Sequence, residues 1–92
     1  MNEKYEVEFS LQANKFLSKI DKSLRKKIIR KIEWLAKNCE IINHQPLQYE
    51  FKDYFKLKLG KIRIIYKIFL QRKVILIAYI DFRDSIYKIH SF

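Results

Sequence analysis

The clearest pattern along the chain lies in residues 53–81, where apolar and polar positions alternate with the period of a β-strand. Residues 54–59 (YFKLKL) place apolar side chains on one side and lysines on the other, and residues 62–69 return with a similar alternation. Gly60, the only glycine, lies between them, where a two-residue hairpin loop needs a positive φ at its first position. Residues 74–80 are apolar at nearly every position, as in a strand buried on both faces. The pattern predicts a twisted antiparallel sheet with one apolar face and one basic face.

Upstream of this sheet, the pattern predicts one further strand and two helices. Residues 4–9 (KYEVEF) alternate and are expected at the sheet edge, where charge discourages association with another sheet. Ser10 is a suitable N-cap for a helix that begins at Leu11, and Asp21 is a suitable N-cap for an amphipathic helix that runs to about Asn38. The predicted fold is therefore α+β, with two antiparallel N-terminal helices packed on one face of a small, twisted, mainly antiparallel β-sheet.

Outside these elements the chain offers few signals. Residues 39–52 lack periodicity, and Pro46 blocks a regular element, so this segment is expected to be a loop. His44 is expected to be polar surface, because no second His or Cys and no carboxylate pair lies at metal-ligand spacing. Cys39, at the end of an apolar helix, is expected to be a packing residue, and residues 82–92 predict a short C-terminal helix. We expect no metal site and no small-molecule cofactor.

The composition adds expectations about size and compartment. The 92 residues are expected to form a single domain, 1–92, with a modest core. One cysteine cannot form an intramolecular disulfide, and the N-terminus carries no hydrophobic signal segment. No apolar run approaches the roughly 20 residues that cross a bilayer. These features predict a cytoplasmic protein without a membrane partner.

The net charge of +10 favours a polyanionic partner, which could be RNA, DNA, an anionic membrane surface or an acidic protein. The densest basic run lies on the second predicted helix, where a solvated surface is the usual explanation. Because six cations occur within ten residues with few acidic neighbours, we predict an RNA- or ribosome-binding surface there. Its residues are Lys22, Arg25, Lys26, Lys27, Arg30 and Lys31. Trp34 is expected at the margin of the core rather than in a stacking role.

A second group of cations is suited to cleaving RNA without a metal ion. In such cleavage the ribose 2′-hydroxyl attacks the adjacent phosphate, so the site must accept a proton and stabilise a charged phosphorane. A lysine crowded by other cations releases its proton more readily, and arginine clamps phosphate oxygens. A tyrosine can stack on a base. The candidates are Lys56, Lys58, Arg63, Arg83 and Tyr87, although their spacing alone fits simple binding equally well.

The same residues carry a resemblance to a known family. Residues 54–68, YFKLKLGKIRIIYKI, resemble the pattern YRLRVGDYRVIY that recurs in the RelE/ParE superfamily of toxin–antitoxin toxins. Residues 82–88, FRDSIYK, resemble the HRRDVY ending of that family, and the resemblance extends over essentially the whole chain. It implies a compact fold of two N-terminal helices on a small antiparallel sheet. For RelE-like members it also implies mRNA cleavage in the ribosomal A site and neutralisation by a cognate antitoxin.

The resemblance also implies roles for individual residues. Lys56 and Lys58 match the two lysines assigned to general base and phosphate binding. Arg63 matches the arginine that stabilises the transition state. Arg83 matches the C-terminal arginine, and Tyr87 matches the tyrosine that orients or stacks on the nucleotide.

Two positions depart from the family pattern. Phe82 stands where many members have histidine, and Asp84 stands where a neighbouring arginine is common. The chain therefore resembles the subgroup that depends on lysine and arginine, and a low rate of cleavage is expected.

The resemblance leaves alternatives from other classes. A ParE-like toxin inhibits DNA gyrase by binding it, without catalysis. A degenerate member would survive mainly as an antitoxin-binding or autorepressing partner. The presence of both lysines, Arg63, Arg83 and Tyr87 favours the nuclease, since a pure binder does not need that set.

Overall fold

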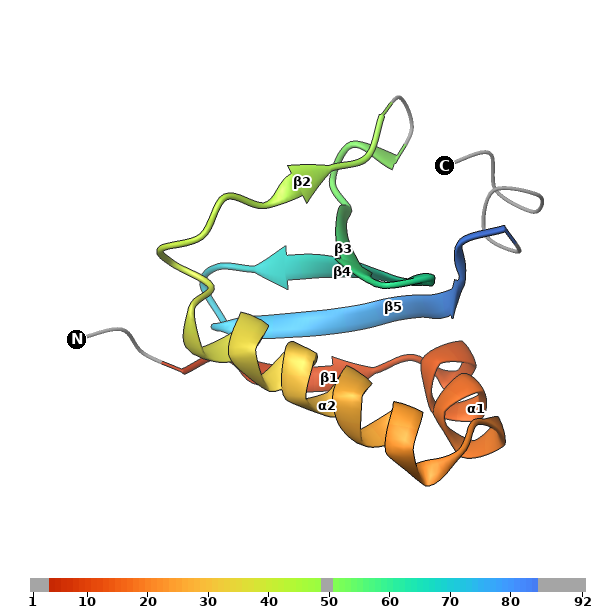
Figure 1. Ribbon diagram of the computed structural model, residues 1–92. Helices are drawn as coiled ribbons and strands as arrows, with labels where there is room; N and C mark the ends of the chain where they lie inside the picture. The colour runs from red at the N-terminus through yellow and green to blue at the C-terminus, as the bar shows by residue number, and fades with distance from the viewer. Residues whose placement is uncertain (1–3, 49–50, 85–92) are drawn as a thin grey trace.

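The computed structural model describes residues 4–48 and 51–84 and confirms the α+β architecture. Along the chain the elements are β1 (Glu6–Phe9), α1 (Leu11–Lys19), α2 (Lys22–Lys37), β2 (Gln45–Pro46), β3 (Phe55–Leu59), β4 (Ile62–Phe69) and β5 (Val74–Phe82). The five strands form one sheet in the order β1-β5-β4-β3-β2 (Figure 1). Within the described residues, β1 alone pairs in parallel, with β5, and the other three pairings are antiparallel.

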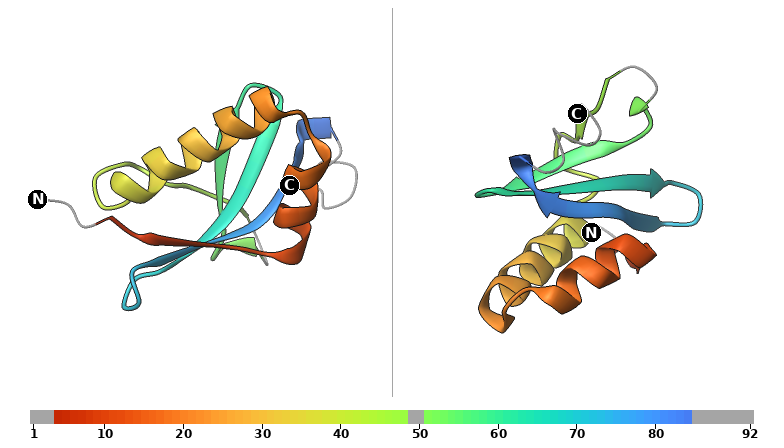
Figure 2. Two further views of the ribbon diagram at one scale, coloured as in Figure 1. Left: turned by 90° about the horizontal axis from the view of Figure 1, so that it is seen from below. Right: turned by 90° about the vertical axis from the view of Figure 1, so that its right-hand side faces the viewer.

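Both helices begin at the predicted caps. The Ser10 side chain accepts a hydrogen bond from the Ala13 amide, and the Asp21 side chain accepts one from the Leu24 amide. These bonds satisfy backbone donors that the first turn of a helix leaves free. The apolar stripes of α1 and α2 then cover a single face of the sheet (Figures 1 and 2).

The hydrophobic core fills the space between this sheet face and the helices. From α2 it receives Ile28, Ile32 and Leu35, all almost completely buried. From β4 it receives Ile64 and Tyr66. Burying large aliphatic side chains contributes about 1.5–3 kcal/mol each, so this layer is the main source of stability.

The β3–β4 hairpin turns through Gly60, as the sequence predicts. Gly60 has φ +57, a conformation that L side chains rarely adopt. The register pairs Leu59 with Ile62, which leaves a two-residue loop. This tight turn fixes which side chains of β3 and β4 lie opposite one another.

An irregularity in β5 could not be predicted from the sequence pattern. Ile65 pairs with Tyr79, whereas Tyr66 pairs with Ile77, so Ala78 is an extra residue in β5. The Ser10 hydroxyl donates a hydrogen bond of 2.7 Å to the Ala78 carbonyl. Because a bulge shifts the alternation by one residue, Tyr79 lies on the face opposite to Ile77.

The segments that precede β3 and follow β5 differ from the central sheet in how far the structure tests their prediction. The predicted loop over residues 39–52 contains the short strand β2, whose Pro46 pairs with Phe55. Proline lacks an amide donor but fits an edge strand, and β2 lies at the sheet edge. The predicted C-terminal helix falls largely on residues 85–92, which lie outside the described residues. Within the described ranges, neither helix has the length and apolar character needed to cross a membrane.

Candidate functional site

The candidate site is built on the sheet face that the helices leave uncovered. Phe55, Leu57 and Leu59 pack against the core cluster on the helix side. Because side chains alternate along a strand, Lys56 and Lys58 point to the opposite face. Lys58 is exposed and Lys56 is partly buried.

Cross-strand register arranges this open face in rows. Lys58 lies opposite Arg63, and Arg63 lies opposite Asp81. The next row contains Lys56, Ile65 and Tyr79. Directly opposed side chains have Cβ atoms about 4.5–5.5 Å apart, so these predicted residues are brought together.

The Arg63 side chain is too enclosed to move freely toward a bound phosphate. Its residue surface is only 6% exposed, although it lies on the face away from the helices. Nη1 donates to the Gly60 carbonyl at 2.8 Å and to the Ile62 carbonyl at 2.9 Å. Nε is buried without a hydrogen-bond partner in the described part of the chain. The guanidinium is therefore fixed against the hairpin turn.

Arg83 reaches the same turn through its backbone. Its amide donates to the Lys61 carbonyl at 2.7 Å, which places Arg83 beside the β3–β4 loop. The side chain is half-exposed, and its Nε lies 3.5 Å from the Asp84 carboxylate. Asp84 therefore offsets part of the charge of Arg83. Tyr87, the remaining predicted catalytic residue, lies outside the described residues.

Two neighbours of the cations were not singled out from the sequence. Tyr79 and Asp81 reach the open face only because of the bulge at Ala78. Burial and the nearby negative charge of Asp81 raise the pKa of the Tyr79 phenol. At neutral pH Tyr79 therefore keeps its proton and can donate a hydrogen bond.

The other half of the open face is apolar, which limits the extent of the site. Leu47 and Ile65 are buried there, and Phe51, Tyr54 and Tyr79 pack against them. The charged row is thus confined to the end of the sheet near the β3–β4 turn.

The predicted RNA-binding residues on α2 do not all share one surface. Arg25 folds back on α1, where Nε donates to the Leu17 carbonyl at 2.8 Å and Nη2 donates to the Ile20 carbonyl at 3.0 Å. Its guanidinium therefore caps the end of α1. The exposed members are Lys22, Lys26, Lys27 and Arg30, while Lys31 is partly buried.

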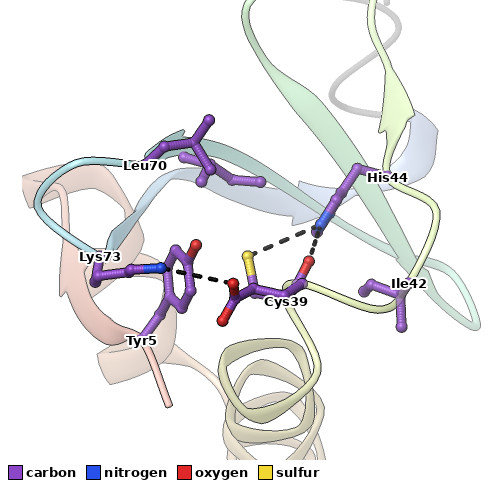
Figure 3. Close-up of a pocket in the computed structure, with 8 residues that line it drawn as sticks. Tyr5, Cys39, Ile42, His44, Leu70 and Lys73 are labelled. Atoms are coloured by element: carbon purple, nitrogen blue, oxygen red, sulfur yellow. Dashed lines mark hydrogen bonds and ion pairs between the residues drawn. The ribbon is translucent and has the colours of Figure 1, made fainter. Parts of the chain in front are cut away.

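A cavity of about 370 Å³ lies at another part of the molecule, lined by residues that include Tyr5, Cys39 and His44 (Figure 3). His44 is partly buried and bonded within the fold, and is not the polar surface residue that the sequence predicts. Its Nδ1 lies 2.6 Å from the Tyr66 hydroxyl, and its Nε2 lies 2.7 Å from the Cys39 carbonyl. Both ring nitrogens are therefore engaged within the fold.

The cysteine beside this histidine is a packing residue, as predicted. Cys39 is 5% exposed, and burial, helped by the charge of Glu40, raises the pKa of its thiol. A protonated thiol is a poor nucleophile. Over residues 4–48 and 51–84, no three His, Cys, Asp or Glu side chains gather as metal ligands would.

Comparison with known structures places this fold among toxins. The toxin–antitoxin complex RelBE2 from Mycobacterium tuberculosis aligns with a TM-score of 0.77 and 22% identity, covering 87% of this chain and 92% of that chain. The isolated RelE toxin of E. coli aligns with a TM-score of 0.71 and 19% identity, over 85% and 83% of the two chains. The archaeal RelE–RelB complex from Pyrococcus horikoshii gives 0.70 and 23%, over 88% and 97%. The fold is therefore that of the RelE toxins.

A family model then identifies the chain. The model described as ParE toxin of type II toxin-antitoxin system, parDE, matches residues 7–87. The chain belongs to this family, within the RelE/ParE superfamily, and is a toxin of a type II toxin–antitoxin system. A search of curated protein sequences gave no match.

Proposed function

We propose that this toxin is a ribosome-dependent endoribonuclease that cleaves mRNA in the A site and so inhibits translation. The observation that carries the proposal is that Lys56, Lys58 and Arg63 share the sheet face that the helices leave open, while the Arg83 backbone is bonded to the adjacent β3–β4 turn. Two lysines and one arginine on one sheet face, with a second arginine beside the turn, match the needs of phosphoryl transfer without a metal ion.

In the proposed reaction, one lysine of β3 accepts the proton of the ribose 2′-hydroxyl. The oxygen then bonds to the adjacent phosphorus, the bond to the 5′-oxygen breaks, and that oxygen takes up a proton. The products are a 2′,3′-cyclic phosphate and a free 5′-hydroxyl. The second lysine, Arg63 and Arg83 stabilise the negative charge on the phosphorane, and Tyr87 orients or stacks on the nucleotide.

The ribosome supplies what this open surface lacks. Lys58 at the end of β3 and Arg83 directly after β5 are both solvent-exposed, so a nucleotide there would be held on one side only. Positioning accounts for a large part of catalysis, and a codon held in the A site provides it. The cations of α2 are proposed to contact RNA or the ribosome, with Arg25 acting through the position of α1.

An in vitro translation assay with primer extension tests this function. Wild-type toxin should produce mRNA cuts within ribosome-bound codons, and Lys58→Ala should reduce them by about 10²-fold or more. Lys52→Ala, an exposed lysine before β3, is the matched control and should cleave like the wild type. Intact mRNA with wild-type toxin would overturn the proposal.

The second candidate is a toxin that binds and inhibits DNA gyrase without catalysis. It is favoured by the family model, which is that of ParE toxins, and by the enclosure of Arg63. DNA damage with intact mRNA after expression would support it. Cuts in ribosome-bound mRNA that disappear in Lys58→Ala would exclude it as the sole activity.

We also propose a cognate antitoxin as a partner in the cytoplasm. Several similar structures are complexes of a RelE toxin with a RelB antitoxin. We expect an acidic and apolar segment that folds on binding to cover the basic sheet face or to displace the C-terminal segment. Hydrogen exchange in the complex should then slow in β3 and β4. Unchanged exchange there and at the C-terminus would contradict this arrangement.

A further inference from the structure

A shallow hollow lies between α2 and the end of β3, outside the residues assigned to catalysis. Its volume is about 380 Å³. Its lining consists of three cations, one aromatic side chain and one leucine, namely Lys27, Arg30, Lys31, Trp34 and Leu59. An ordinary solvated helix surface carries charged and polar side chains, whereas here an indole lies among the cations.

The spacing along α2 explains why these side chains meet. Positions 27, 30, 31 and 34 follow the spacing i, i+3, i+4 and i+7, so they share one face of the helix. Trp34 is 41% exposed, although an indole is among the most apolar side chains that a protein can bury. The Lys31 ammonium lies 4.2 Å from the centroid of its ring. Part of the Trp34 ring is therefore exposed to solvent and lies beside cations.

The hollow also adjoins the proposed catalytic surface. Leu59 directly precedes Gly60, whose carbonyl accepts a hydrogen bond from Arg63. The Lys61 carbonyl in the same turn accepts a hydrogen bond from the Arg83 amide. Among the described residues, the β3–β4 turn lies between the two surfaces, and the hollow joins the end of β3 to residues 27–34 of α2. A nucleic-acid strand that leaves one surface can therefore pass around the turn to the other.

We propose that this hollow binds single-stranded RNA next to the cleavage site, with one base stacked on Trp34 and phosphates contacted by Lys27 and Arg30. The proposal rests on the proposed endoribonuclease function, and it gives Trp34 the stacking role that the sequence did not predict. Cations alone would attract any polyanion, but a flat apolar ring is used by a base and not by a phosphate. Lys31 would move from the ring to a phosphate when a base takes its place.

The relative strengths of these contacts favour that exchange. Stacking of a base on an aromatic side chain strengthens binding by about tenfold. A cation–π contact at an exposed site contributes only a few-fold. The hollow can therefore accept a base even though Lys31 covers the ring in the free protein.

The test uses the full-length toxin and a short, 2′-O-methylated single-stranded RNA, which cannot be cleaved because its 2′-oxygen carries no proton. Trp34 is the only tryptophan, so its fluorescence reports directly on the hollow. We expect the RNA to quench this fluorescence strongly through base stacking, whereas inorganic polyphosphate, which has no bases, should change it far less. With labelled RNA, Trp34→Leu should weaken binding about tenfold, and Trp34→Phe should restore most of it.

Matched charge variants separate the hollow from the general basic surface. Arg30→Gln should lower the slope of log affinity against log salt by about 1. Lys15→Gln, at an exposed lysine of α1 outside the basic surface of α2, should change affinity less than Arg30→Gln does. Equal RNA affinity in Trp34→Leu and wild type, or equal quenching by RNA and polyphosphate, would overturn the proposal. The translation assay is run in parallel, so RNA quenching without mRNA cleavage refutes only the nuclease, whereas cleavage without quenching refutes only the hollow.

Discussion

Arg63 shows how the fold and the proposed site can make different demands on one side chain. Nη1 binds two carbonyls of the turn, whereas the buried Nε has no partner in the described residues. An unsatisfied buried polar atom costs about 1–3 kcal/mol. Lys58 lies directly opposite and adds like-charge repulsion. A stability-optimised sheet would not keep this arrangement, which is consistent with selection for charge at this position.

Replacing Arg63 with methionine should separate these two demands. Arg63→Met keeps an unbranched side chain of similar length but removes the charge and the unsatisfied Nε. We expect the free energy of unfolding in urea to change by less than about 1 kcal/mol, while mRNA cleavage falls about 10²-fold or more. Arg63→Ala would also leave a cavity and should be less stable than Arg63→Met. Cleavage at the wild-type rate by the folded Arg63→Met variant would remove Arg63 from the site.

Tyr66 provides a residue-scale prediction about pH. Burial, helped by the nearby Cys39, raises the pKa of the Tyr66 phenol well above its usual range. In the unfolded chain this phenol ionises at about pH 10. Its contribution to stability is therefore fully present below that pH and is lost as the pH rises above it.

Tyr66→Phe removes both the titrating group and the 2.6 Å hydrogen bond to His44. We expect a loss of about 1–3 kcal/mol in the free energy of unfolding at pH 7, because the His44 Nδ1 is left without its partner. Between pH 9 and 11 the variant should lose less stability than the wild type, as measured by urea unfolding. Parallel pH profiles for the two proteins would contradict the assigned cause.

At the scale of elements, the contact between α1 and β5 determines how β5 contributes to the site. The Ser10 amide donates to the Ile77 carbonyl, and the Ser10 hydroxyl donates to the Ala78 carbonyl. Gln12 makes two further hydrogen bonds with the backbone of Ile80. These bonds hold the bulge, and the bulge places Tyr79 on the open face.

Ser10→Ala should destabilise the protein more than an ordinary surface substitution. It removes the cap of α1 and the bond to Ala78 together, so we expect a loss of about 1–2 kcal/mol. Ser18→Ala is the matched control, because among the described residues the Ser18 hydroxyl bonds only the Lys15 carbonyl of the same helix. Its effect should stay within about 0.5 kcal/mol. Equal unfolding midpoints for the two variants would show that Ser10 does not hold the bulge.

The elements themselves could be predicted because each has a local signal. Ser10 and Asp21 mark the helix starts, and Gly60 marks the hairpin, because caps and tight turns depend on single residues. The bulge at Ala78 has no such signal, since it depends on hydrogen bonds to a distant helix. For the same reason the sequence could place Arg25 on a basic helix but not foresee its contact with α1. The sequence could predict which element carries each candidate residue, whereas the exposure of its side chain was decided by tertiary contacts.

At the scale of the whole molecule, cations lie in clusters whose mutual repulsion lowers the stability of the fold. The net charge is +10, and the cations cluster on α2 and on the sheet face around Lys58 and Arg63. Mutual repulsion within such clusters destabilises the compact state. A polyanionic partner would relieve that repulsion, so its binding should couple to stability as well as to function.

Ionic strength tests this coupling. Because the Debye length falls to about 10 Å at 0.1 M salt, added NaCl should screen repulsion between the cations and raise the Tm in thermal unfolding. Polyphosphate should raise the Tm further at the same ionic strength, since it binds the native cation clusters and not an evenly charged unfolded chain. Lys58→Gln should be more stable than the wild type at low salt and should gain less from NaCl, because one of two opposed cations is gone. A Tm that falls as NaCl rises would mean that attractive ion pairs outweigh repulsion in the folded state, so that the basic clusters carry no stability cost for a partner to relieve.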